Sequence, residues 1–199
     1  MSLDMLNEPL QALFASHVDT VYRALDVMYP EIHRAVEPLC DSLLADRRVL
    51  VCGSGTGTAL GQVFCTNLLN RAQIDRPGLP VIAIGSDPAA TSAIAESYGI
   101  SEVQSRQIRA LGQAGDALMV IAGSPRGAGL SPAVRAAHAR EMRVIALTGG
   151  AGGEPAAALG PADIELRVPS DDPYRVSESQ LLLLNALSAL IELRLFGEA

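Results

Sequence analysis

The residues that could do chemistry begin with a glycine-rich stretch, Gly53 to Thr58, in which small residues carrying hydroxyl groups follow a short apolar run. This order is typical of a buried strand, a tight turn and the first turn of a helix. The first turn of a helix offers unpaired backbone N–H groups and the positive end of the helix dipole, which suit an anion. We therefore predict a phosphate-sized anion site at Ser54, Gly55, Thr56 and Thr58. A strand-to-helix turn without a ligand would explain the same residues.

Two familiar phosphate motifs do not fit this stretch. Its glycines give G-x-G-x-G, but the dinucleotide fingerprint has its last glycine or alanine one position later, where this chain has Thr58. A Walker loop needs a Lys-Ser or Lys-Thr pair, and neither follows. Hydroxyl groups rather than a lysine would therefore hold the phosphate.

Composition limits the classes of function. The 199 residues suit one domain, and a formal net charge of −7 without a basic run argues against direct nucleic-acid binding. The apolar stretches are too short or too interrupted to span a membrane, and the N-terminus lacks a signal-peptide pattern. Three cysteines without metal-type spacing and three scattered histidines indicate reduced thiols, no metal site and no cofactor. We expect a cytoplasmic protein.

Hydrophobic periodicity divides the chain into an N-terminal part and an α/β core. Residues 5–46 show two helical stripes separated at Tyr29-Pro30, which predicts a helical hairpin over 1–47. In the core, 48–199, strands are predicted at 49–52, 81–84, 117–121, 144–147 and 164–168, and helices at 57–72, from Asp87, and at 102–112, 132–140 and 175–196.

Apolar strands that alternate with helices predict a parallel sheet covered on both faces. The expected fold is therefore an α/β three-layer sandwich in a single domain, 1–199. Ligands bind such sheets beyond the carboxyl ends of the strands. Three predicted strands end in small, glycine-rich loops, 53–58, 122–131 and 148–153, which favours a pocket at this edge.

The motifs, in their order and spacing, resemble the SIS (sugar isomerase) family, in the branch that holds phosphoheptose isomerase and the DnaA initiator-associating protein. The resemblance covers essentially the whole chain. Its pieces are Cys-Gly-Ser-Gly-Thr at 52–56, Asn70-Arg71, Arg76 to Pro80, Arg109 to Asp116, Ala146 to Gly149, Gly152 to Glu154, Leu159 to Pro161 with Asp163, and Arg175 with Glu178. The resemblance implies five parallel strands flanked by helices, a bound sugar phosphate and a homotetramer.

The departures from the family concern catalysis. Aligned through these motifs, the family's glutamate falls at Asn67 and its histidine at Asn185, and neither amide shuttles protons near neutral pH. A metal-binding histidine falls at Val63 and a glutamine at Ser177, so no imidazole or carboxylate remains for a metal. Ser177 stays a candidate for contact with the sugar phosphate.

The family's second phosphate loop is also altered. Its Ser-Thr-x-Gly-Asn-Ser pattern corresponds here to Ala122 through Gly127, in which Ser124 offers one hydroxyl group. Arg126 could pair with a phosphate through two hydrogen bonds, or it could be a solvated loop residue. We predict that Ser124 and Arg126 contribute to sugar-phosphate binding.

Three functions remain open. The first is a non-catalytic binding protein whose partner is the bacterial replication initiator, as the resemblance implies; Leu195 and Phe196 would contact that partner, or would simply pack the helix end. The second is a phosphoheptose isomerase or a related sugar-phosphate isomerase. Glu178 is then the best remaining base, although a carboxylate at a helix N-terminus is also favoured by the dipole, and Asp87 and Glu96 are weaker candidates. The third is a sugar-phosphate sensor without turnover.

Overall fold

The computed structural model describes residues 6–127 and 129–197. In chain order its elements are α1 (Asn7–Leu44), β1 (Val49–Ser54), α2 (Thr56–Leu69), β2 (Val81–Ala83), α3 (Pro88–Tyr98), the 3-10 turn η2 (Ile100–Glu102), α4 (Val103–Leu111), β3 (Ala117–Ala122), α5 (Leu130–His138), β4 (Arg143–Gly149), α6 (Gly153–Ala157), β5 (Ile164–Val168) and α7 (Pro173–Phe196).

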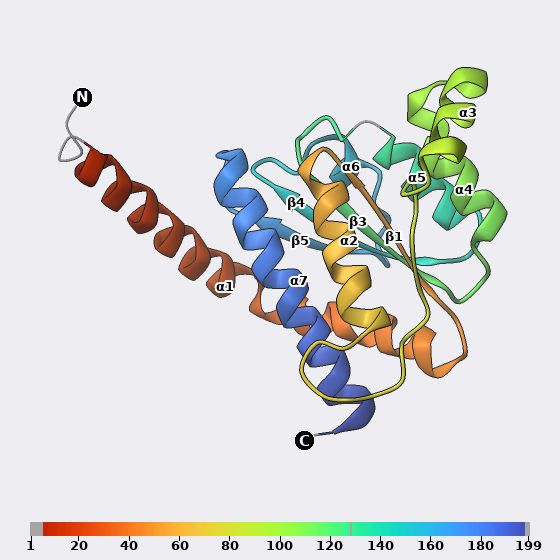
Figure 1. Cartoon of the computed structure of the whole chain (residues 1–199), viewed down its shortest axis with the longest axis horizontal. Coiled ribbons are helices and arrows are strands. Elements are labelled where there is room, and N and C mark those ends of the chain that lie inside the picture. Colours follow the sequence, from red (N-terminus) through yellow and green to blue (C-terminus); the bar gives the residue numbers. More distant parts are fainter. Residues whose placement is uncertain (1–5, 128, 198–199) are drawn as a thin grey trace.

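The five strands form one parallel sheet in the order β2-β1-β3-β4-β5 (Figure 1). The order places β2 on one side of β1 and the later strands on the other. The connections therefore diverge between β1 and β3, and in open α/β sheets this point opens a crevice at the carboxyl ends of the strands. Ser54 and Ala122, the last residues of these two strands, are directly paired.

Helices cover both faces of the sheet, because alternate strand residues point to opposite sides. One core cluster joins α1, α2 and α7 to residues such as Val51 and Met119. The other joins α4 and α5 to residues such as Leu50 and Val120. The predicted α/β sandwich with five parallel strands is confirmed.

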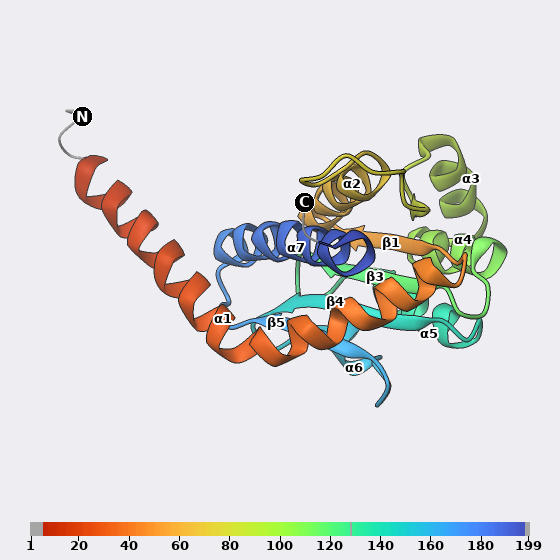
Figure 2. The same ribbon diagram turned by 90° about the horizontal axis from the view of Figure 1, so that it is seen from below.

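The predicted N-terminal hairpin is wrong, because residues 7–44 form a single helix that contains Pro30 and Pro38. Figure 2 shows that α1 bends in the part that holds Pro30, after which the helix continues along the sheet. A proline inside a helix removes one hydrogen bond and kinks the axis, but the helix need not end there. The first half of α1 projects away from the sheet (Figures 1 and 2), although Ala24 and Met28 near the bend are buried in the core; residues 7–28 are called the arm here.

By length and composition alone, the last helix, α7, could cross a membrane, so the expectation that every apolar stretch is too short or too interrupted does not hold for this helix. In the structure it is a core helix, because Leu183, Leu184, Leu187 and Ile191 are buried in the cluster that it shares with α1 and α2. It runs from the carboxyl edge of the sheet to the far end of the molecule, where the C-terminus lies (Figure 1).

Candidate functional site

The loops after β1 and β3 touch at the carboxyl edge of the sheet. The backbone N–H of Gly123 donates to the carbonyl of Ser54 at 3.2 Å. A Cβ atom at Gly123 would lie 2.4 Å from that carbonyl oxygen and 2.8 Å from the hydroxyl oxygen of Thr56. Only glycine therefore permits this approach, and the predicted first and second phosphate loops are neighbours in space.

A cavity of about 270 Å³ opens beside this contact. Its walls come from residues 122–125 after β3, from Gly149, Gly150 and Gly152 after β4, and from Ser170, Asp171, Pro173 and Val176 at the start of α7. Of the residues predicted to bind a sugar phosphate, Ser124 lines the cavity. Arg126 is exposed in the same loop.

The first loop has the geometry of an open helix N-terminus. Gly55 precedes α2 with φ of 56°, and nothing lies within 4 Å of the position where its Cβ would be. Thr56, the first residue of α2, is exposed. Ser54 has a buried hydroxyl group with no hydrogen-bond partner among the described residues. The hydroxyl group of Thr58 instead donates to the carbonyl of Gly53 at 3.0 Å, so its hydrogen is already engaged.

Buried polar atoms without a partner gather at this edge of the sheet. Within the described part of the chain they are Ser54 Oγ, Gln104 Oε1, Gln107 Nε2, Arg175 Nε, Ser179 Oγ and Gln180 Oε1. Each residue lies at or beside a carboxyl strand end or in the first turns of α7. Native proteins leave few buried polar atoms unpaired, and such atoms call for a water molecule, an ion or a ligand. Their common location makes this edge the candidate binding region.

Among these residues, sequence reasoning named Ser54 as a binding residue and Arg175 as part of a family motif, and it missed the other four. Gln180 is fully buried, and its Nε2 donates to the carbonyl of Ala122 at 3.1 Å, directly before the loop that lines the cavity. Gln104 Nε2 donates to the carbonyl of Gly53 at 3.2 Å. The sequence gives no signal for these contacts, since a glutamine in an amphipathic helix is indistinguishable from a surface residue until its neighbours are known.

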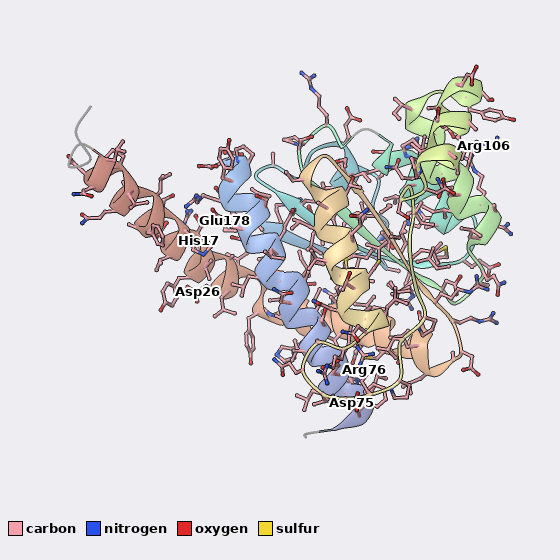
Figure 3. The ribbon with its side chains drawn as sticks, in the orientation of Figure 1. His17, Asp26, Asp75, Arg76, Arg106 and Glu178 are labelled. Atoms are coloured by element: carbon pink, nitrogen blue, oxygen red, sulfur yellow. The ribbon has the colours of Figure 1, made fainter. Side chains whose placement is uncertain are left out.

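Glu178, the candidate base, is held by other side chains. Its carboxylate lies 2.7 Å from His17 Nδ1 and accepts a hydrogen bond from Arg175 at 2.9 Å. Figure 3 shows His17 and Glu178 facing each other where the arm of α1 passes the start of α7. Glu178 is not among the residues that line the cavity. The neighbouring Ser177 donates its hydroxyl group to the carbonyl of Tyr174 at 3.0 Å.

The other candidate carboxylates also lie outside the cavity lining. Asp87 caps α3 by accepting hydrogen bonds from the backbone N–H groups of Ala89 and Ala90 at 2.8 and 3.1 Å. Glu96 is exposed on the same helix. Burial raises the pKa of the Cys52 thiol, in β1, to about 12, so this thiol stays protonated near neutral pH.

Asn67 and Asn185 meet between α2 and α7. Asn67 Nδ2 donates to Asn185 Oδ1 at 3.0 Å and lies 3.4 Å from the hydroxyl oxygen of Ser188. Residues 118 positions apart in the sequence are therefore brought into contact. Val63, one turn before Asn67, is 39% exposed. In the described residues no group of three or more His, Cys, Asp or Glu side chains could hold a metal ion.

The predicted partner contact lies at the other end of α7. Leu195 is half-buried and packs against the core, whereas Phe196 is 43% exposed. The guanidinium of Arg76 lies over the Phe196 ring, 5.9 Å from its centroid. The two predicted residues thus differ, since one packs the helix end and the other offers an aromatic surface.

The parallel sheet, the order of its strands and the glycine-rich loops at its carboxyl edge define a ligand-binding α/β domain. The family model described as SIS domain matches residues 14–149, and the chain belongs to this family.

Two kinds of relative match nearly the whole chain. The DnaA initiator-associating protein DiaA of Shigella flexneri serotype 5b is 39% identical over 191 residues, which cover 96% of this chain and 97% of that protein. The phosphoheptose isomerase of Chromohalobacter salexigens is 40% identical over 184 residues, covering 92% and 93%. A solved phosphoheptose isomerase from Francisella tularensis has a TM-score of 0.89 at 36% identity, covering 92% of this chain and 96% of that one.

Proposed function

We propose that this chain binds a sugar phosphate at the carboxyl edge of its sheet without isomerising it, and acts as a binding protein of the DnaA initiator-associating kind. The observation that carries the proposal is the contact between Asn67 and Asn185 at 3.0 Å. The family resemblance assigns a catalytic glutamate and histidine to these two positions. Their contact supports that assignment, yet a pair of amides cannot take a proton from a sugar carbon and return it.

The phosphate group of the sugar phosphate fits the loop after β1 and the loop after β3. Gly55 faces open space before α2, and Ser54 carries a hydroxyl group without a partner in the described chain. Ser124 lines the adjoining cavity. Backbone N–H groups at the start of a helix of 14 residues, together with the dipole of that helix, favour a phosphate there.

Phosphoheptose isomerase is the second candidate, because relatives of that name are as similar to the chain as the initiator-associating proteins. It would need a base, and Glu178 is the carboxylate that the sequence offers. In the structure Glu178 is paired with His17 and Arg175 outside the cavity lining. We therefore rank this function below the binding protein.

We further propose a homotetramer; the family resemblance supplies the number four, and the exposed apolar side chains support association. The arm of α1, together with Leu6 directly before it, carries large apolar side chains that are 45% to 68% exposed: Leu6, Leu10, Leu13, Phe14, Val18, Tyr22, Leu25 and Val27. Apolar exposure on this scale marks a surface that another chain covers. Light scattering at micromolar concentration measures the state, and a monomer would contradict this part of the proposal.

Turnover and partner binding separate the two functions. Aldose–ketose isomerisation moves a proton between carbons, so an isomerase incubated with sedoheptulose 7-phosphate in D₂O gives deuterated sugar. We expect no deuterium in the sugar and capture of the purified replication initiator by the immobilised chain. Deuterium incorporation that Glu178→Gln abolishes would move the isomerase to first place. Loss of initiator capture in Phe196→Ala, with an unchanged melting temperature, would support the predicted contact.

A further inference from the structure

A buried ion pair lies at the corner where α7 ends, far from the cavity. This corner is formed by the loop 70–80, between α2 and β2, and by the last turns of α7. Arg76 of the loop and Glu192 of α7 meet at 2.8 Å, and their side chains are only 1% and 3% exposed. Figure 3 shows Arg76 at the C-terminal end of α7, opposite the end that holds Glu178.

Arg76 uses all three of its guanidinium nitrogens. Nε donates to Glu192, Nη1 donates to the carbonyls of Leu68 and Pro77 at 2.8 and 2.9 Å, and Nη2 donates to the carbonyl of Asn67 at 2.9 Å. Asn67 and Leu68 lie in the last turn of α2, where helix carbonyls lack partners within the helix. Arg76 therefore ties the end of α2 to the end of α7.

Glu192 holds the other side of the same loop. Its carboxylate accepts hydrogen bonds from the backbone N–H groups of Ala72, Gln73 and Ile74, at 2.6, 2.8 and 3.3 Å. With the bond from Arg76, the carboxylate fixes four donors of one short loop. A loop without helix or strand structure gains a single defined conformation in this way.

Arg76 of this ion pair also lies over the exposed ring of Phe196. Arg76 lies over Phe196 at a distance suited to a cation–π contact, and Leu69 and Leu193 at the ends of α2 and α7 are 56% and 46% exposed. We propose that Glu192 is a positioning residue for a protein-docking surface made of Phe196, Leu193 and the loop 70–80, which it shapes before a partner arrives. This inference rests on the proposed function in taking the replication initiator as the occupant.

Two physical arguments favour a role in positioning. A buried ion pair is often no more stabilising than apolar residues of the same volume, so stability alone is a weak reason for its presence. Ordering a loop and its side chains beforehand lowers the entropy that binding must otherwise supply. Because Glu192 fixes the loop beforehand, Phe196 loses less conformational entropy when the partner binds.

A fluorescent reporter tests the positioning without any partner. The chain contains no tryptophan, so F196W introduces a single indole at the corner. In that background we compare Glu192→Gln with Glu31→Gln, which alters an exposed ion pair on α1. We expect Glu192→Gln to increase acrylamide quenching, to lower the fluorescence anisotropy, and to reduce amide-exchange protection at 72–74 at least about tenfold. Glu31→Gln should change none of these. Unchanged quenching and protection in Glu192→Gln would overturn the inference.

Binding to the purified initiator tests the docking part, in the background with Phe196 intact. We expect Glu192→Gln to weaken binding about tenfold, as Phe196→Ala does. A loosened corner with unchanged affinity would overturn the docking role. A parent chain that does not bind the initiator would remove the proposed function, whereas the fluorescence still decides whether Glu192 positions Phe196. If Glu192→Gln fails to fold, Arg76→Lys serves in its place, because lysine keeps the charge beside Glu192 but lacks the planar fork.

Discussion

The two ends of α7 differ in the hydrogen bonding of their buried polar atoms. At its start, Arg175 Nε, Ser179 Oγ and Gln180 Oε1 have no hydrogen-bond partner within the described residues. At its end, the carboxylate of Glu192 accepts four hydrogen bonds. The start borders the cavity at the carboxyl edge. The end borders the loop 70–80 (Figure 1).

The buried hydrogen bonds at the start of α7 are incomplete, as in a site that binds a ligand, whereas those of Glu192 near its end are complete. Unpaired buried polar atoms are a cost that a ligand or water can remove on binding. Fully paired atoms gain nothing from a ligand, so they serve to hold neighbouring groups in place. In our proposal, one helix links a small-molecule site that completes its hydrogen bonds on binding to a docking surface that is already shaped.

The largest effect is expected when the buried ion pair between Arg76 and Glu192 is broken. We expect Glu192→Gln to lower the free energy of unfolding by about 3–5 kcal/mol, because it leaves the charge of Arg76 buried without its partner. The matched change Glu31→Gln affects a pair with Arg34 whose side chains are 57% (Arg34) and 35% (Glu31) exposed, and should lower it by about 0–1 kcal/mol. Urea denaturation measures both. Equal losses in the two variants would contradict the comparison.

A smaller effect is expected from pH. Burial raises the pKa of Glu192, but hydrogen bonds from Ala72, Gln73, Ile74 and Arg76 outweigh burial and hold the pKa below its ordinary value of 4.5. Since the folded-state pKa is depressed, the stabilisation is present above the unfolded value and is lost as the pH falls through the folded value.

Stability curves that compare the parent chain with Glu192→Gln test this sign. Between about pH 6 and about pH 3, the free energy of unfolding should fall more steeply for the parent chain than for the variant. Parallel curves would show that the carboxylate of Glu192 contributes no pH-dependent stability.

The smallest expected effect separates two buried serines of α7. Ser188 donates to the carbonyl of Leu184 at 2.8 Å, so Ser188→Ala should lower the free energy of unfolding by about 1 kcal/mol. Ser179 is equally buried but has no partner among the described residues, so Ser179→Ala should be neutral or slightly stabilising. Thermal and urea unfolding of the two variants provide the measurement. A loss in Ser179→Ala as large as that in Ser188→Ala would remove the distinction between the two ends.

The sheet could be predicted from the sequence because its signal is local. Short runs rich in apolar residues predict all five strands, and the predicted strand 164–168 agrees with β5 at both ends. The hairpin was wrong because Tyr29-Pro30 looks like a helix end, whereas the proline only bends α1. Packing against α7 and the sheet keeps the helix continuous there, and packing cannot be seen in a local pattern.

The candidate site was predictable only in part. The glycine-rich loops and Ser124 follow from local motifs, and the family alignment named Asn67 and Asn185 before their contact was known. The unpaired atoms of Ser179 and Gln180 depend on what surrounds them in three dimensions. The pair of Arg76 with Glu192 joins positions 116 residues apart, and no spacing rule connects them.

Calorimetric titration of the chain with sedoheptulose 7-phosphate, followed by analysis of the sugar recovered from the cell, tests the central claim most directly. The account predicts a saturable heat of binding, weakened in Gly123→Ala because a Cβ atom there would push the two loops apart, together with unchanged sugar at the end. Conversion of the sugar to its aldose isomers would contradict the claim that Asn67 and Asn185 cannot support isomerisation. Absence of any binding heat for this sugar phosphate and for inorganic phosphate would contradict the claim that the carboxyl edge is a ligand site.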